Sequence, residues 1–163
     1  MIVFGVDPGT AITGFGIIRE NQNSYMEMVD CGVIRTSAKL SDSERLQQLY
    51  KQISDLLILH KPDCGAVEKL FFQQNVSTAI SVGQARGVIL LAMANCGLTI
   101  GEYTPLQVKQ AVVGYGKADK AQIQRMVATL LHLSSNPTPD DAADALAVGI
   151  CHLSCQKLNE MIQ

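Results

Sequence analysis

Several features that mark particular protein classes are missing from this sequence. Its 163 residues include only 13 glycines and 5 prolines, and 47% are apolar, which excludes disordered and collagen-like chains. The longest unbroken apolar run, Val88 to Ala94, is far shorter than the roughly 20 residues that a membrane crossing needs. The five cysteines have no paired Cys-x-x-Cys spacing, and residues 1–7 have no basic lead-in typical of a signal peptide. We therefore expect a single cytoplasmic domain over residues 1–163, with no membrane segment.

The sequence also lacks an excess of basic residues. Lys and Arg number 13 against 15 Asp and Glu, a net charge of -2, whereas nucleic-acid-binding domains are usually basic. The basic residues are nevertheless unevenly distributed, because residues 101–126 contain four of them and only two acidic residues. These cations are Lys109, Lys117, Lys120 and Arg125. Tyr and Gln side chains that suit phosphate and base contacts lie between them, so this segment is either a solvated helical face or a DNA-contacting surface.

Short apolar runs and turn signals predict a mixed α/β fold. The first three strands are expected to form an antiparallel meander, and the later alternation of strands and helices indicates parallel pairing with helical crossovers. A capping box at Ser41 and the Lys61-Pro62 stop delimit the first helix. The expected strands are 2–6, 15–18, 26–34, 64–68 and 98–103, and the further helices are 77–95, 105–113, 119–133 and a last one after residue 139.

Acidic residues occupy the ends of two predicted strands and the start of the last helix. Asp7 and Glu68 each end an apolar strand, and Asp141 and Asp144 share one face of the helix because three residues turn it by about 300°. Each has an alternative interpretation: Asp7 caps its own turn, Glu68 pairs with Lys69, and the helical acids favour the helix dipole. Capping does not account for Asp144, so the four acids together predict a site for hard divalent cations.

Such a site points to phosphate chemistry. Two ions about 3.5–4 Å apart stabilise both the attacking and the leaving oxygen of an in-line displacement at phosphorus. We interpret Asp140 as a capping residue and the three histidines as structural. A zinc site at Cys151, His152 and Cys155 is a weaker alternative to ordinary helix packing, because a second pair of ligands at suitable spacing is missing.

Six separated motifs occur in the order found in one nuclease family. They are GVDPG at 5–9, VEKLF at 67–71, GQARG at 83–87, QVKQ at 107–110, VGYGKADK at 113–120 and DAADALA at 141–147. With these motifs the chain resembles the RuvC-type Holliday junction resolvases, crossover junction endodeoxyribonucleases of the ribonuclease H-like superfamily. The resemblance implies a ribonuclease H-like mixed five-stranded sheet flanked by helices.

The resemblance also assigns roles to individual residues. It implies that the four carboxylates, Asp7, Glu68, Asp141 and Asp144, are catalytic and bind two Mg²⁺ ions per active site, with Mn²⁺ as a substitute. Lys109 and Lys120 match the family's functional lysines near the scissile strand, and either would aid the attacking water. Phe71 matches an aromatic residue that contacts bases at the junction. We expect Lys109, Lys117, Lys120 and Arg125 to contribute to DNA binding as well.

Family members act as homodimers that make paired nicks across a four-way junction in DNA recombination and repair, and they cooperate with the RuvA–RuvB branch-migration complex. The resemblance places the second helix in the dimer interface, where Gly83 and Gly87 permit close approach. No small-molecule cofactor is expected.

Two other functions fit parts of the pattern. The sequence Asp7-Pro8-Gly9-Thr10 is also typical of actin-like nucleotide-binding phosphotransferases, but these need a duplicated domain, and the chain contains no internal repeat. A non-catalytic junction-binding module on the same fold should lack one or more of the four carboxylates, all of which are present here.

Overall fold

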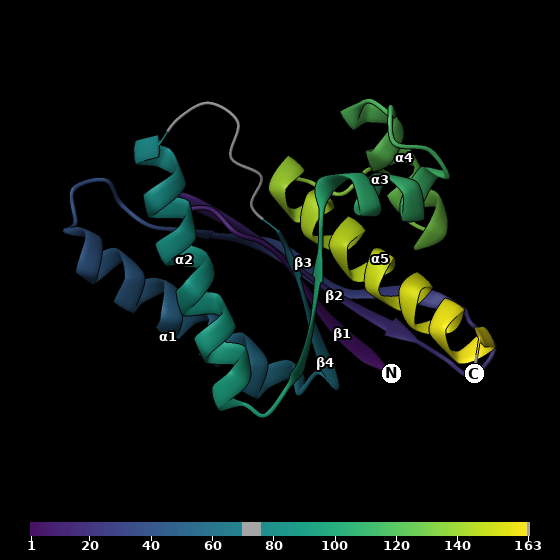
Figure 1. The fold of residues 1–163 in the computed structure, drawn as a ribbon, viewed down its shortest axis with the longest axis horizontal. Coiled ribbons are helices and arrows are strands. Elements are labelled where there is room, and N and C mark those ends of the chain that lie inside the picture. Colours follow the sequence, from purple (N-terminus) through teal and green to yellow (C-terminus); the bar gives the residue numbers. More distant parts are fainter. Residues whose placement is uncertain (70–75, 163) are drawn as a thin grey trace.

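The computed structural model describes residues 1–69 and 76–162 as strands, helices and their connections (Figure 1). The elements in chain order are β1 (Ile2–Asp7), β2 (Ile12–Glu20), β3 (Met26–Arg35), α1 (Asp42–His60), β4 (Cys64–Glu68), α2 (Val76–Asn95), β5 (Thr99–Tyr103), α3 (Pro105–Val113), α4 (Lys120–Leu130) and α5 (Asp140–Ile162).

The five strands form one sheet in the order β3-β2-β1-β4-β5. β1 pairs with β2 and β2 with β3 in antiparallel fashion, whereas β1 pairs with β4 and β4 with β5 in parallel. The mixed sheet predicted from the sequence is therefore confirmed. Because β1 and β4 are parallel neighbours, the acids at their carboxyl ends lie at the same edge of the sheet.

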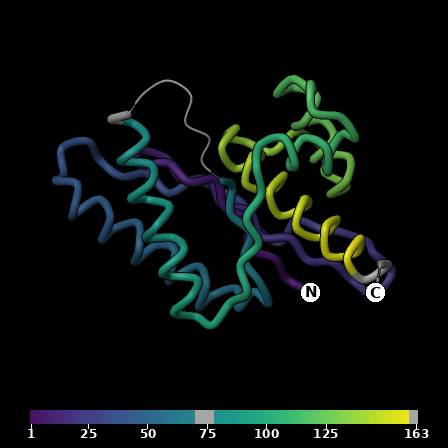
Figure 2. The backbone as a smooth tube through the Cα atoms, viewed as in Figure 1, coloured from purple at the N-terminus to yellow at the C-terminus, as the bar shows by residue number. Residues whose placement is uncertain are grey.

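Helices cover both faces of the sheet. Figure 2 shows α1 and α2 on one side of the sheet and α3, α4 and α5 on the other. Alternate β1 residues serve the two sides: Val3 belongs to the core beneath α5, and Phe4 to the core beneath α1 and α2. This two-sided burial explains why the strand is almost continuously apolar.

Small residues allow α5 to lie close against the sheet. A Cβ atom at Gly5 would collide with the carbonyl oxygen of Ala145, and one at Gly14 with the carbonyl oxygen of Asp141. The alanines of the first turns of α5 are buried in this contact. The close packing carries the acidic start of the helix to the strand ends.

Local signals set most helix boundaries. The predicted capping box is present at α1, where the Ser41 amide donates to Glu44 and the Glu44 amide donates to the Ser41 hydroxyl. The predicted helix over 119–133 is shorter in the structure. Asp119 is its N-cap, and His132 has a positive φ of 55°, which is incompatible with continued helix.

In the described parts of the chain, no helix has both the length and the apolar character needed to cross a membrane.

Candidate active site

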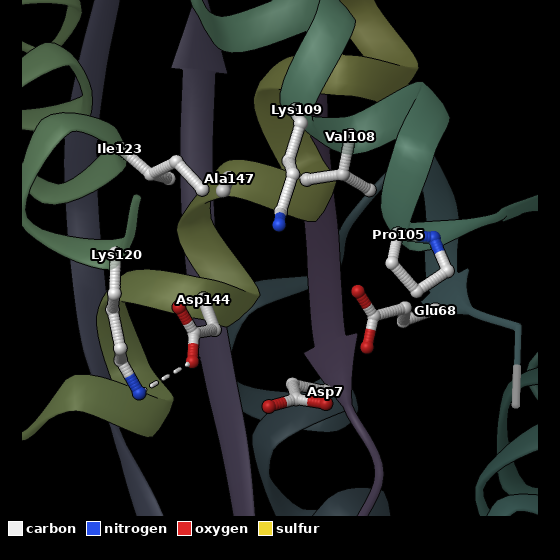
Figure 3. Close-up of a pocket in the computed structure, with 9 residues that line it drawn as sticks. All are labelled: Asp7, Glu68, Pro105, Val108, Lys109, Lys120, Ile123, Asp144 and Ala147. Carbon is white, nitrogen blue, oxygen red and sulfur yellow. Dashed lines mark ion pairs between the residues drawn. The ribbon is translucent and has the colours of Figure 1, made fainter. Parts of the chain in front are cut away.

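A pocket of about 240 Å³ lies at the carboxyl ends of β1 and β4, beside α3, α4 and α5 (Figure 3). Three acids and two lysines contribute to its lining, and the remainder is largely apolar. The lining residues are Asp7, Glu68, Pro105, Val108, Lys109, Lys120, Ile123, Asp144 and Ala147. Most of the residues singled out in the sequence as catalytic therefore face one space.

Backbone pairing fixes the two strand acids. Val6 of β1 is in register with Val67 of β4, so the next residues, Asp7 and Glu68, leave the sheet side by side. Glu68 is also in register with Tyr103 of β5. The carbonyl oxygen of Tyr103 accepts a hydrogen bond of 2.7 Å from the backbone amide of Lys69, the residue after Glu68. The position of Glu68 is thus defined by strands on both sides.

The third acid of the pocket comes from α5. Asp144 projects into the pocket, where one of its carboxylate oxygens lies 3.2 Å from Lys120 Nζ (Figure 3). Asp141, one turn earlier, is outside the pocket lining. Its charge nevertheless contributes to the raised pKa of Asp7. The role of Asp141 as a metal ligand stays a prediction.

Electrostatic repulsion is strong among these acids. Burial, together with the charges of Glu68, Asp144 and Asp141 in decreasing order, raises the pKa of Asp7 to about 8. Burial and the charge of Asp144 also raise the pKa of Glu68, whereas a hydrogen bond with the Asp7 side chain and the charge of Lys109 lower it. Burial raises the pKa of Asp144, although its contact with Lys120 acts in the opposite direction. A bound cation would relieve this repulsion.

The donor set suits a hard divalent ion, because it supplies carboxylate oxygens from strand ends and a helix. The side chains are not gathered into a finished ligand shell: within residues 1–69 and 76–162, no three Asp, Glu, His or Cys side chains converge closely enough to hold a metal. The carboxylates that line the pocket are nevertheless of the chemical type that fits a divalent metal site.

Of the predicted basic residues, two reach the pocket and two do not. Lys109 from α3 and Lys120 from α4 both line it. Lys117 and Arg125 are exposed and lie outside the lining. The predicted base-contacting residue, Phe71, lies outside the residues that the structure describes.

Two contacts that position the lysines of the pocket were not predicted from the sequence. The first is the capping box of α3, in which Thr104 accepts from the Gln107 amide and the Gln107 side chain accepts from the Thr104 amide. It fixes the start of the helix that carries Lys109, and the pattern Thr-x-x-Gln was a usable signal. The second is the contact between Asp140 and Lys120, whose Nζ lies 3.4 Å from an Asp140 oxygen.

The zinc alternative at the end of the chain gains no support from the structure. Cys151 and His152 are buried in α5, and His152 Nδ1 forms a hydrogen bond of 2.9 Å with the Tyr103 hydroxyl. This contact connects α5 to β5, and burial lowers the pKa of His152. Cys151 and His152 therefore contribute to the packing of α5, which is the interpretation that the sequence favoured.

Comparisons with known proteins identify the family. The family model described as crossover junction endodeoxyribonuclease RuvC matches residues 3–152. A relative with this description from Pelotomaculum thermopropionicum is 55% identical over 152 residues, which cover 93% of this chain and 92% of the relative. The structure is similar to that of Thermus thermophilus RuvC, with a TM-score of 0.90, 32% identity, and coverage of 98% of this chain and 97% of the other.

A second solved structure, T. thermophilus RuvC in complex with a Holliday junction substrate, matches with a TM-score of 0.89 and 30% identity, covering 97% of this chain and 96% of that one. These matches confirm the expected ribonuclease H-like fold class and the resemblance stated from the six motifs. They also leave the actin-like alternative without support, since the family match begins before Asp7 and includes its motif. The chain belongs to the RuvC family of crossover junction endodeoxyribonucleases.

Proposed function

We propose that this protein resolves four-way DNA junctions by hydrolysing one phosphodiester bond in each of two strands. The observation that carries the proposal is the convergence of Asp7, Glu68 and Asp144 on one pocket with Lys109 and Lys120. Relatives that share more than half of their residues with this chain are named crossover junction endodeoxyribonucleases. Membership of this nuclease family implies dependence on a divalent metal ion.

The four carboxylates are the proposed metal ligands. Asp7 and Glu68 would hold the ions from the sheet edge, and Asp144 and Asp141 from α5, with two Mg²⁺ ions per site and Mn²⁺ able to substitute. When bound, such ions supply an activated water and stabilise charge on the leaving oxygen. A histidine or serine nucleophile is not required for this chemistry.

The remaining pocket residues orient the substrate. Lys109 and Lys120 approach the carboxylates from α3 and α4, and we assign them to the phosphate oxygens, whose charge they offset. Val108 and Ile123 are buried side chains that hold these two helices against α5. The lysines are therefore presented by rigid elements, which keeps a phosphate in a defined orientation. Lys117 and Arg125, exposed outside the pocket, are assigned to more distant DNA phosphates.

A homodimer is the proposed acting form. Residues 80, 83, 87 and 91 lie along one side of α2. Ile80 and Leu91 are 60% and 54% exposed, and Cβ atoms at Gly83 and Gly87 would meet no atom within 4 Å. An open apolar strip with small residues at its centre suits close packing against the same strip of a second copy. Two copies would supply the two active sites that paired nicks require.

We expect four further properties of this protein. The residues 1–163 act as one domain, the protein works with the RuvA–RuvB branch-migration complex, and it acts in the cytoplasm, where its DNA substrate would be found. Phe71 is the proposed contact to bases at the junction.

Replacement of Asp7 tests the proposal. We expect Asp7→Asn to lower the rate of cleavage of a synthetic four-way junction in Mg²⁺ by at least about 100-fold, because it removes a central ligand charge while keeping the side-chain size. The matched control is Asp42→Asn, which neutralises an exposed acid in the first turn of α1, away from the pocket. Cleavage by Asp7→Asn at the wild-type rate would contradict the metal-site assignment. Binding by the wild-type protein without cleavage in Mg²⁺ or Mn²⁺ would instead support a non-catalytic junction-binding module.

A further inference from the structure

Lys120 has two acidic partners, and only one of them lines the pocket. Its Nζ lies 3.2 Å from Asp144 Oδ2 and 3.4 Å from Asp140 Oδ2. Asp144 faces the other carboxylates, with a side chain that is 33% exposed, whereas Asp140 lies at the rim and is 62% exposed. The lysine therefore spans the boundary between the proposed metal site and the solvent.

Asp140 is itself held in place from α4. The Gln124 side-chain amide donates a hydrogen bond of 2.9 Å to Asp140 Oδ1, which leaves Oδ2 facing Lys120. Lys120 and Gln124 are four residues apart on α4, and Asp140 and Asp144 are four residues apart on α5. Residues at this spacing are neighbours on a helix surface, so two adjacent side chains of α4 contact two adjacent side chains of α5.

We propose that Asp140 is a positioning residue that keeps Lys120 at the edge of the active site when Asp144 binds metal. The inference rests on the proposed function, since it takes Asp144 as a metal ligand and Lys120 as a phosphate contact. A carboxylate that coordinates a cation has a weaker attraction for a neighbouring ammonium group. Asp140, with one oxygen fixed by Gln124, remains available as the second partner.

The arrangement contributes little to folding, because ion pairs between exposed side chains have small net energies. Its effect is on the position of a long, flexible lysine side chain. Without Asp140 the ammonium group would sample more rotamers once Asp144 is engaged, and the fraction of time it spends near the phosphate would fall.

A crystal structure with Ca²⁺ bound provides a test that does not depend on activity. We expect Asp144 to coordinate Ca²⁺ while Lys120 Nζ remains within ion-pair distance of Asp140. A structure in which Lys120 leaves Asp140 when Ca²⁺ binds would overturn the proposal. If the four carboxylates bind no Ca²⁺ and the wild-type protein cleaves no junction, the proposed function itself fails.

Kinetics provide a second test with a built-in control for helix stability. We expect Asp140→Asn to lower the single-turnover rate about two- to fivefold, the range typical of one exposed ion pair, without weakening junction binding in Ca²⁺. The same substitution in a Lys120→Met background should change the rate by less than about 1.5-fold, since its partner is gone. Gln124→Leu should reproduce part of the loss in the wild-type background.

Two outcomes would contradict this role. An equal loss of rate in both backgrounds, with a lower Tm, would mean that Asp140 only stabilises the start of α5. Tighter junction binding in Ca²⁺ with an unchanged rate would mean that Asp140 only repels DNA. Asp42→Asn, which neutralises a first-turn acid elsewhere, is the matched control and should leave all three measurements unchanged.

Discussion

At the scale of single residues, Asp7 has the most distinctive environment. It lies at the end of a buried strand, next to another strand-terminal acid and opposite a helical one, and its pKa of about 8 results from burial followed by these charges. An aspartate in this state is unfavourable as an anion unless a cation is present. The same feature that makes the site suitable for metal therefore destabilises the metal-free fold.

This cost should be measurable as a pH dependence of stability. The pKa of Asp7 is 3.8 in the unfolded chain and about 8 in the folded protein. Between these values Asp7 is protonated to a greater extent in the folded state than in the unfolded state, so the free energy of unfolding falls as the pH rises through this window. In EDTA at pH 8, Asp7→Asn should therefore have a Tm a few degrees above that of the wild type. The difference should disappear near pH 4.

Thermal unfolding monitored from pH 4 to 8.5, with and without Mg²⁺, checks this expectation. Mg²⁺ should raise the Tm of the wild type and have much less effect on Asp7→Asn, because binding to the native state stabilises it. A variant that is less stable than the wild type at pH 8 in EDTA would show that the carboxylate is not under repulsion.

At the scale of elements, the packing of α5 against β1 and β2 decides the geometry of the site. Asp7 of β1 is in register with Gly14 of β2, and Gly14 lies directly beneath the Asp141 carbonyl oxygen. The absence of a side chain at this point brings the start of α5 to the strand ends. The helix and the strand thus supply ligands to one pocket because their backbones are almost in contact.

A methyl group at position 14 should separate them. We expect Gly14→Ala to lower the free energy of unfolding by roughly 1–3 kcal/mol, since the obstacle is backbone of a packed helix and not a flexible side chain. Junction cleavage should fall by more than about tenfold, because α5 carries Asp144. Denaturant unfolding and a cleavage assay measure the two effects, and wild-type values in both would contradict the packing argument.

At the scale of the whole molecule, the net charge of -2 is a misleading guide to DNA binding. Four of the 15 acids are assigned to metal ligation, and without them the 13 basic residues are in the majority. If these acids bind cations as proposed, the acidic sheet edge would become a surface that attracts phosphate. The remaining positive charge is modest and concentrated in residues 109–125.

Junction affinity should consequently depend on a metal ion and on salt. In Ca²⁺, we expect the dissociation constant to increase at least about tenfold between 50 and 200 mM salt, because each phosphate neutralised by a cation releases counterions. Simultaneous replacement of Lys117 and Arg125 by Ala should reduce the slope of log affinity against log salt. A dissociation constant that scarcely changes over this range would exclude residues 109–125 as the DNA contact.

The sequence by itself determined the number and order of the strands, most helix boundaries, the family and the identity of the candidate acids. These depend on local patterns: the capping box at Ser41, the apolar runs that end at Asp7 and Glu68, and the spacing of Asp141 and Asp144. The second strand is longer than predicted: β2 covers Ile12–Glu20, where residues 15–18 were expected. Only the tertiary structure decided which of the side chains meet. It brought Lys109 and Lys120 to the pocket but left Lys117 and Arg125 outside, and it paired Asp140 with Lys120 and Gln124, where the sequence indicated only a cap. The reason is physical: hydrogen bonding and periodicity act between near neighbours in the chain, whereas the contact between α4 and α5 depends on how both helices pack against the sheet.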